Sequence, residues 1–439
     1  MEAFFQYIKD MIGNKNVRQK LLRTLAFLAL YRFLVYVPVP FVNIEAMRNA
    51  TVGAGWGLEY FAMLLWGTLE QFSLIAVGLI PYINASIILQ LLTAVVPKLE
   101  ELQEQGQQWT QKIQQYTRRL TFPLAFLQSI GMVFFINYLL GGNVIATDIG
   151  TILLTAFTLS VGSILLVWIG EMITEKGISN GISILIFASI VAGITSQTYS
   201  FLGASGSDLL NVVLFMFLIV LVLVVLSVLL IKTIKDIPVV YARQWAMQET
   251  ASLPIPLNPV GMIPIIFAVA FVTFPYLISQ LVNNLGSQNP TMQSIGQWIE
   301  LNFNIYTQQP GWFVIIAYFI LIVLFTFFYA MITFNPEKMA DTIQKRGWFV
   351  PGIRPGEETA KYFNSVLMHL AFRWGLWLAF IGVYTYVLSY IPFVQQAAQS
   401  IGSIPVVVQG AWVIIIVWVV QELVNKINSE LLMERYDRI

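Results

Sequence analysis

Long apolar stretches alternate with shorter polar connections along the whole chain. Ten of the stretches are long enough to cross about 30 Å of hydrocarbon as helices. They cover residues 22–41, 71–96, 119–140, 150–173, 181–202, 208–232, 260–283, 311–334, 366–392 and 404–427. Isolated strands would leave backbone groups unpaired in lipid, so each stretch is predicted to be a transmembrane helix. The pattern therefore predicts an all-α membrane protein with ten transmembrane helices.

The composition agrees with lipid as the main solvent. Hydrophobic residues make up 57% of the chain and charged residues 11%, whereas a soluble domain carries about a quarter charged residues. The chain has no cysteine, which excludes disulfides, thiolate metal sites and a thiol nucleophile. His369 is the one histidine, so a histidine-built metal site or a Ser-His-Asp relay is not expected. A nucleotide-binding glycine loop and an acidic metal cluster are also lacking, so the sequence predicts no enzyme and no cofactor.

Basic residues lie almost entirely on one side of the predicted helices. The N-terminal segment, the even-numbered connections and the C-terminal end carry nearly all of them, whereas the opposite connections hold only Arg48. Because loops rich in lysine and arginine stay in the cytoplasm, both termini are predicted to be cytoplasmic. An even number of helices agrees with this orientation. Apolar residues at helical spacing between Phe4 and Ile12 predict a short helix on the membrane surface.

A short motif recurs in the second and seventh predicted helices. Residues 78–81 read Gly-Leu-Ile-Pro and residues 261–264 read Gly-Met-Ile-Pro. Proline inside a helix removes a hydrogen bond and kinks or breaks the preceding turn. Taken singly, each motif is equally compatible with a kink that serves only packing. Two matched breaks instead indicate an inverted repeat, with an N-terminal half over residues 1–205, a C-terminal half over residues 206–439 and a functional centre between them.

The middle of the predicted bundle is nearly free of ionisable side chains. Arg32 lies in the middle to late part of the first helix and Arg373 in the cytoplasmic part of the ninth. The other ionisable residues lie near cytoplasmic ends, namely Glu171, Glu422 and His369. An ion-coupled transporter needs ionisable groups at the bilayer centre. The sequence therefore favours a passive conduit sealed by apolar side chains. A small-solute secondary transporter is the alternative, and an intramembrane enzyme would lack its catalytic groups.

Five segments resemble signatures of the SecY family, the channel subunit of the bacterial Sec protein translocase. They are residues 78–90 (GLIPYINASIILQ), 115–118 (QYTR), 173–183 (ITEKGISNGIS), 258–264 (NPVGMIP) and 350–361 (VPGIRPGEETAK). The segments lie in the order of the family and extend from the second helix past the eighth. The resemblance implies a clamshell of two inverted five-helix halves around a central pore. It also implies passage of unfolded secretory proteins and sideways release of transmembrane segments through a gate between helices two and seven.

The resemblance assigns roles to particular residues. The apolar pore ring would consist of Leu79, Ile83, Ile182, Ile186, Ile266 and Ile415. The lateral gate and its helix breaks would include Gly78, Pro81, Asn84, Ser86, Gly261 and Pro264. An external plug would contain Gly55, Trp56, Leu58, Tyr60, Phe61, Met63, Leu64 and Leu65.

The resemblance also implies partners and a location. The expected subunits of the complex are SecE and SecG. The SecA motor or a translating ribosome would bind cytoplasmic loops that include Arg243 and Arg354. The remaining partners are precursor proteins that carry signal peptides, and membrane lipid. The expected location is the bacterial inner (plasma) membrane. The loop over residues 97–118 is rich in glutamine, and the loop over residues 233–258 lacks the usual run of basic residues. Less basic charge weakens contact with RNA or an acidic partner, so the balance between SecA and ribosome, and between a housekeeping and an accessory translocase, stays open.

Overall fold

The computed structural model describes most of the chain. The described residues are 11, 13–42, 72–96, 107–139, 145–146, 148–202, 209–241, 251–258, 260–285, 290–305, 310–392, 394–395 and 410–437. The predicted plug, Arg243 and all of the predicted surface helix except Met11 lie outside these residues.

The described part of the chain is mostly helical, and each of the ten apolar stretches overlaps a helix. The first five are α2 (Lys15–Val35), α5 (Ile80–Val95), α7 (Gln107–Leu139), α8 (Ile149–Lys176) and α9 (Gly181–Leu202). The second five are α10 (Leu209–Lys232), α11 (Ile263–Leu285), α13 (Trp312–Thr333), α15 (Glu357–Leu388) and α17 (Gly410–Asp437). Within the described residues, four helical stretches are long and apolar enough to cross a membrane by length and composition alone. They are Ile149–Lys176, Trp312–Lys345, Glu357–Leu388 and Gly410–Met433.

Capping residues and turns explain where two helices depart from the predicted bounds. Helix α2 begins before the apolar run because the Asn14 side chain accepts hydrogen bonds from the backbone N–H groups of Asn16 and Val17. Helix α5 begins later than predicted because residues 72–79 form turns, in which Gly78 has a φ of 66°. The length of an apolar stretch predicts the part of the chain that crosses the membrane, whereas caps and turns determine where the helix begins.

A small sheet and two short helices were not predicted. Strands β1 (Ile234–Tyr241), β2 (Ala251–Pro256) and β3 (Trp348–Phe349) form an antiparallel sheet in the order β2-β1-β3. Helices α12 (Pro290–Phe303) and α14 (Pro336–Lys345) lie in connections. The sheet shares a separate apolar cluster with α14 and the first part of α15, including Ile237, Ile255, Ile343 and Phe363. The all-α prediction thus describes the helical bundle and omitted this sheet.

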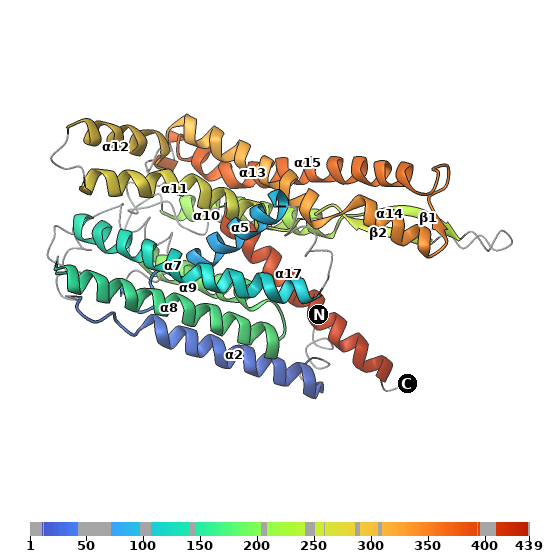
Figure 1. Cartoon of the computed structure of the whole chain (residues 1–439), viewed down its shortest axis with the longest axis horizontal. Coiled ribbons are helices and arrows are strands. Elements are labelled where there is room, and N and C mark those ends of the chain that lie inside the picture. The colour runs from blue at the N-terminus through green and yellow to red at the C-terminus, as the bar shows by residue number, and fades with distance from the viewer. Residues whose placement is uncertain are drawn as a thin grey trace.

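The long helices pack in two sets, and corresponding members of the sets make corresponding contacts. In the first set, α5 packs against α7, α7 against α8 and α8 against α9. In the second set, α11 packs against α13, α13 against α15 and α15 against α17. Figure 1 shows α2, α7, α8 and α9 in one layer and α11, α12, α13 and α15 in the other, with α5 between them. Contacts between the sets are fewer and join α5 and α7 to α11, and α2 and α9 to α17.

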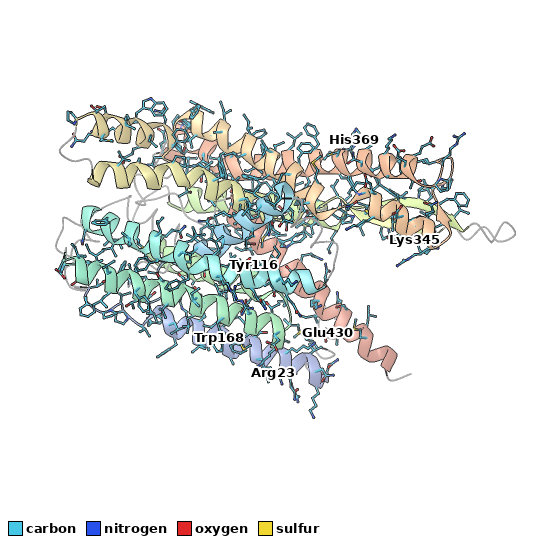
Figure 2. The ribbon with its side chains drawn as sticks, in the orientation of Figure 1. Arg23, Tyr116, Trp168, Lys345, His369 and Glu430 are labelled. Carbon is cyan, nitrogen blue, oxygen red and sulfur yellow. The ribbon has the colours of Figure 1, made fainter. Side chains whose placement is uncertain are left out.

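The start of α2 and the end of α17 lie at one end of the bundle, together with β1, β2 and α14 (Figure 1). Val17 of α2, Ile178 of the α8–α9 turn and Ile427 of α17 form one buried cluster there. The Lys20 ammonium donates to the Glu430 carboxylate over 2.5 Å. This terminal joint, defined by these five residues, connects the last helix of the second set to the first set. Figure 2 shows Arg23 and Glu430 in the same region.

Candidate functional site

The two Gly-x-Ile-Pro motifs adopt the same backbone conformation in the two helix sets. Gly78 has a φ of 66° and Gly261 a φ of 70°, in the left-handed region that glycine enters without a steric penalty. Each glycine lies two residues before the start of its helix, and Pro81 and Pro264 are the second residues of α5 and α11. The prolines therefore lie in the first helical turn, where an absent N–H costs little. The predicted interruption is a tight turn ahead of each helix and does not fall inside it.

The turn before α11 is fixed by side chains from three segments. The Gly261 N–H donates to the Asn258 side-chain oxygen over 2.6 Å. The buried Trp374 indole of α15 donates to the Gly261 carbonyl over 3.0 Å. A Cβ added at Gly261 would lie 3.2 Å from the Trp418 ring of α17. Local sequence and tertiary contacts thus hold the start of α11 in one position.

All six residues predicted to form the pore ring belong to one apolar cluster. Leu79, Ile186 and Ile415 are buried members of this cluster, and Ile83, Ile182 and Ile266 are partly buried against it. They come from α5 and its preceding turn, α9, α11 and α17. This cluster is the main apolar core of the bundle and has members in both helix sets, from every long helix except α7. One member also packs within its own set, because the Ile182 δ-methyl lies against Gly170 of α8.

The segment over residues 173–183 forms the tight α8–α9 connection. The Asn180 side chain accepts hydrogen bonds from the N–H groups of Ile182 and Ser183, which caps α9. The Gly181 N–H donates to the Thr174 hydroxyl over 2.8 Å. A Cβ at Gly181 would lie 1.9 Å from the Gly170 carbonyl oxygen, so only glycine allows this approach. The turn places the first residues of α9 against α8.

Uncharged polar side chains accompany α5, as the sequence suggested. Asn84 and Ser86 are partly buried, and the Gln90 amide donates to the Ser86 hydroxyl over 3.0 Å. Neither α5 nor α11 contains an acidic or basic residue. No group of three or more histidine, aspartate or glutamate residues within the described ranges could hold a metal ion.

The charged residues that the sequence placed near helix ends make contacts that sequence reasoning missed. The Arg118 guanidinium lies 3.1 Å from the Glu171 carboxylate, which links α7 to α8. The Ser179 hydroxyl donates to the Glu422 carboxylate over 3.1 Å, which links the α8–α9 turn to α17. The sequence did contain a signal for these contacts, because a carboxylate in an otherwise apolar helix needs a polar or charged partner when it leaves water. Arg354 lies exposed in the turn before α15.

Comparisons with known proteins identify the family. The SecY family model matches residues 73–424. A protein translocase subunit SecY from Bacillus licheniformis is 36% identical over 447 residues, which cover 98% of this chain and 98% of the relative. A subunit of the same name from Corynebacterium glutamicum is 36% identical over 454 residues, which cover 100% of this chain and 99% of that relative. The chain belongs to the SecY family.

Solved structures share the fold of this SecY-family chain. The structure of a protein-conducting channel aligns with a TM-score of 0.62 at 17% identity, covering 96% of this chain and 93% of the other. Sec61 in the canine ribosome–channel complex from the endoplasmic reticulum aligns with a TM-score of 0.60 at 16% identity, with the same two coverages. At these identities the similarity shows the fold, which is that of a multi-pass membrane protein. Both Gly-x-Ile-Pro turns lie within the residues that the SecY family model matches.

Proposed function

We propose that this chain is the channel through which unfolded secretory proteins cross the bacterial inner membrane. The observation that supports the proposal is that the six ring residues, from α5 and its preceding turn, α9, α11 and α17, belong to an apolar core shared by both helix sets, while α5 and α11 contain no charged side chain. An apolar constriction excludes water and ions while closed and binds a passing polypeptide only weakly. The six ring residues would provide this seal. Such a channel needs no catalytic group and no cofactor.

The lateral gate is proposed to lie between α5 and α11. These helices contact each other, but each packs more extensively within its own set, α5 against α7 and α11 against α12 and α13. An interface with few contacts separates at a lower cost than the interior of either set. The matched turns at Gly78 and Gly261 would act as the fixed ends from which the two helices part, with Asn84 and Ser86 on α5 as polar positions in the gate.

The two helix sets are proposed to be the inverted halves of a clamshell, over residues 1–205 and 206–439. Equivalent neighbours pack in both sets, which is expected of an internal repeat. Five helices in each half give the halves opposite orientations in the membrane. Lysine and arginine gather in the connections that lie with the two chain ends, which supports cytoplasmic termini.

Partners are proposed from the family relationship. SecE and SecG would be the accompanying subunits, and SecA or a translating ribosome would supply the energy, with precursor proteins that carry signal peptides as substrates. Cytoplasmic partners would approach the end of the molecule that holds β1, β2 and α14, where Arg354 is exposed. A partner contact at Arg243 and the external plug are also part of the proposal, and both rest on the sequence alone.

Resting ion conductance tests the apolar seal directly. The complex reconstituted in planar bilayers should show little resting current, and the variants Ile83→Asn and Ile266→Asn should each raise it several-fold because an amide hydrates the constriction. Leu221→Asn on the outward face of α10 is the matched control, because Leu221 is half exposed and lies outside the ring. Unchanged currents in both ring variants would overturn the assignment of the seal.

The transporter alternative predicts a different result. A small-solute carrier would show saturable uptake of solute into vesicles and no transport of a precursor protein. No acidic or basic residue lies within α5 or α11 to bind a coupling ion, so we expect precursor transport without such uptake.

A further inference from the structure

A surface cavity lies beside α15, at the end of the bundle that holds β1, β2 and α14. It has a volume of about 280 Å³ and is lined by Lys235, Ser365, Val366, His369, Leu370 and Arg373. Three of these residues repeat every four positions on one face of α15, and Lys235 reaches the cavity from the start of β1. Figure 2 shows His369 on the outer side of α15. The cavity is outside the apolar cluster assigned to the channel.

The cavity carries positive charge that the protein does not neutralise. Lys235 and Arg373 form no ion pair with any residue in the part of the chain that the structure describes. Asp236 follows Lys235 in β1, but successive side chains of a strand point to opposite faces. Glu357, two turns before Ser365 on α15, is already paired with Lys361 over 2.8 Å. Two cations therefore face a cavity without a protein counter-charge.

Hydrogen-bond donors inside the cavity add to the charge. The His369 Nδ1 atom lies 2.6 Å from the Ser365 carbonyl oxygen. A carbonyl oxygen only accepts, so Nδ1 is the donor, and the Nε2 atom donates to a ligand only when the ring carries a second proton. The Arg373 guanidinium offers several more donors in a planar array suited to the oxygens of a phosphate. Charge and donors together favour an oxyanion.

The surface next to the cavity is apolar and exposed. Phe372, next to Arg373 in the chain, and Leu376 and Phe380, one and two turns further along α15, are exposed, and Ile234 lies exposed next to Lys235. Arg373 lies seven residues inside the predicted ninth span (366–392), about 10 Å from its cytoplasmic boundary at 1.5 Å per residue. An arginine at this depth extends its charge toward the headgroups while its stem contacts acyl chains. The surface thus combines cationic side chains near the cytoplasmic boundary of the bilayer with exposed apolar side chains on the same helix.

We propose that this cavity is a binding site for an anionic glycerophospholipid of the cytoplasmic leaflet. Its phosphate would contact Arg373 and Lys235, and its acyl chains would lie along Phe372, Leu376 and Phe380. Basic recesses at the cytoplasmic side of membrane helices suit such headgroups. The proposal rests on the membrane placement of α15 and does not require conduction through the channel. Because Lys235 is the second residue of β1 and α15 packs on α14 and the sheet, the bound lipid would connect the bilayer to these partner-facing elements.

Native mass spectrometry of the intact chain tests the site. The protein would be released from micelles that contain either phosphatidylglycerol or phosphatidylcholine, and bound lipids would be counted. Wild type should retain phosphatidylglycerol in preference to phosphatidylcholine. Arg373→Gln should lower the retained phosphatidylglycerol about fivefold at equal lipid concentration, and Lys235→Gln should act in the same direction. Lys361→Gln is the matched control, because Lys361 lies on α15 outside the cavity and is paired with Glu357.

Each outcome decides the proposal. Loss of phosphatidylglycerol in both cavity variants but not in Lys361→Gln supports it. Equal retention in all variants, or equal retention of both lipids by wild type, overturns it. Displacement of the lipid by millimolar inorganic phosphate would identify a site for a free anion, and displacement by a soluble acidic peptide would identify a protein-docking site. Both results contradict a lipid site. The measurement does not involve precursor transport, so its failure leaves the channel proposal unaffected, and failure of the channel tests leaves this site unaffected.

Discussion

At Gly261, the backbone of one residue meets side chains from three parts of the chain. Asn258 accepts from its N–H, Trp374 donates to its carbonyl, and the Trp418 ring lies 3.2 Å from the position of an added Cβ. The left-handed conformation at this glycine is repeated at Gly78 in the other helix set. The chain thus uses the same residue type, in the same conformation, to start the two helices that we propose to form the gate.

We predict that Gly261→Ala and Gly78→Ala destabilise the protein. A side chain in the left-handed region costs about 1–2 kcal/mol, and at Gly261 the added methyl also lies against Trp418. Thermal unfolding in detergent, followed by tryptophan fluorescence, measures the change. Gly193→Ala is the control, because nothing lies within 4 Å of a Cβ built there and it is within α9. The control should be neutral or stabilised by about 0.5–1 kcal/mol, and an equal loss in all three variants would contradict the assignment.

We predict that Trp374→Phe lowers the free energy of unfolding. The change keeps a large aromatic ring but leaves the Gly261 carbonyl without its indole donor, at a cost of about 1–3 kcal/mol for a buried group. Trp168→Phe on the exposed face of α8 is the control (Figure 2). The same unfolding assay should separate the two variants. Equal midpoints would mean that the hydrogen bond contributes little to the stability of the turn.

At the scale of elements, the terminal joint connects the last helix to the first set. Val17, Ile178 and Ile427 provide the apolar contact, and Lys20 and Glu430 the charged one. A partly exposed ion pair contributes at most about 1 kcal/mol, so the joint depends mainly on its apolar contact. The joint holds α2, the α8–α9 turn and α17 together at one end of the molecule.

We predict that Lys20→Cys combined with Glu430→Cys is joined efficiently by a short bismaleimide. The two side chains meet in the structure, and the chain has no cysteine of its own to give background. After partial proteolysis between positions 20 and 430, the cross-linked chain stays joined and migrates on a gel differently from the separated fragments. Lys20→Cys with Gln297→Cys is the control, since α12 lies at the opposite end of the bundle (Figure 1). Equal cross-linking of both pairs would contradict the joint.

Sequence reasoning located the helices because lipid imposes a simple rule on them. Apolar runs of sufficient length had to be helical, and every one overlaps a helix. The small sheet was missed because its strands lie in a polar connection, where β1 gains its stability from pairing with β2 and β3 and from packing on α14. The matched glycines were visible in the sequence, but their left-handed conformation and the Trp374 contact depend on distant parts of the chain.

At the scale of the whole molecule, the orientation can be tested with single cysteines. Gln297 on α12 and Lys345 on α14 are exposed and lie at opposite ends of the bundle (Figures 1 and 2). In spheroplasts, whose cell wall has been removed but whose inner membrane is intact, a membrane-impermeant maleimide should label Gln297→Cys and leave Lys345→Cys unlabelled. After the membrane is opened, both should react. The reverse pattern would place the chain ends outside and contradict the positive-inside assignment.

The central claim is that a polypeptide passes between the two helix sets through the apolar cluster. Photo-crosslinkers would be placed at Ile83 and, separately, at Ile266, with Leu154 on the exposed face of α8 as the control. A secretory precursor would then be stalled in transit. The account predicts that hydrophilic mature segments of the precursor cross-link to positions 83 and 266 but not to position 154. Polar segments that never cross-link to either ring position, although the precursor is transported, would contradict it.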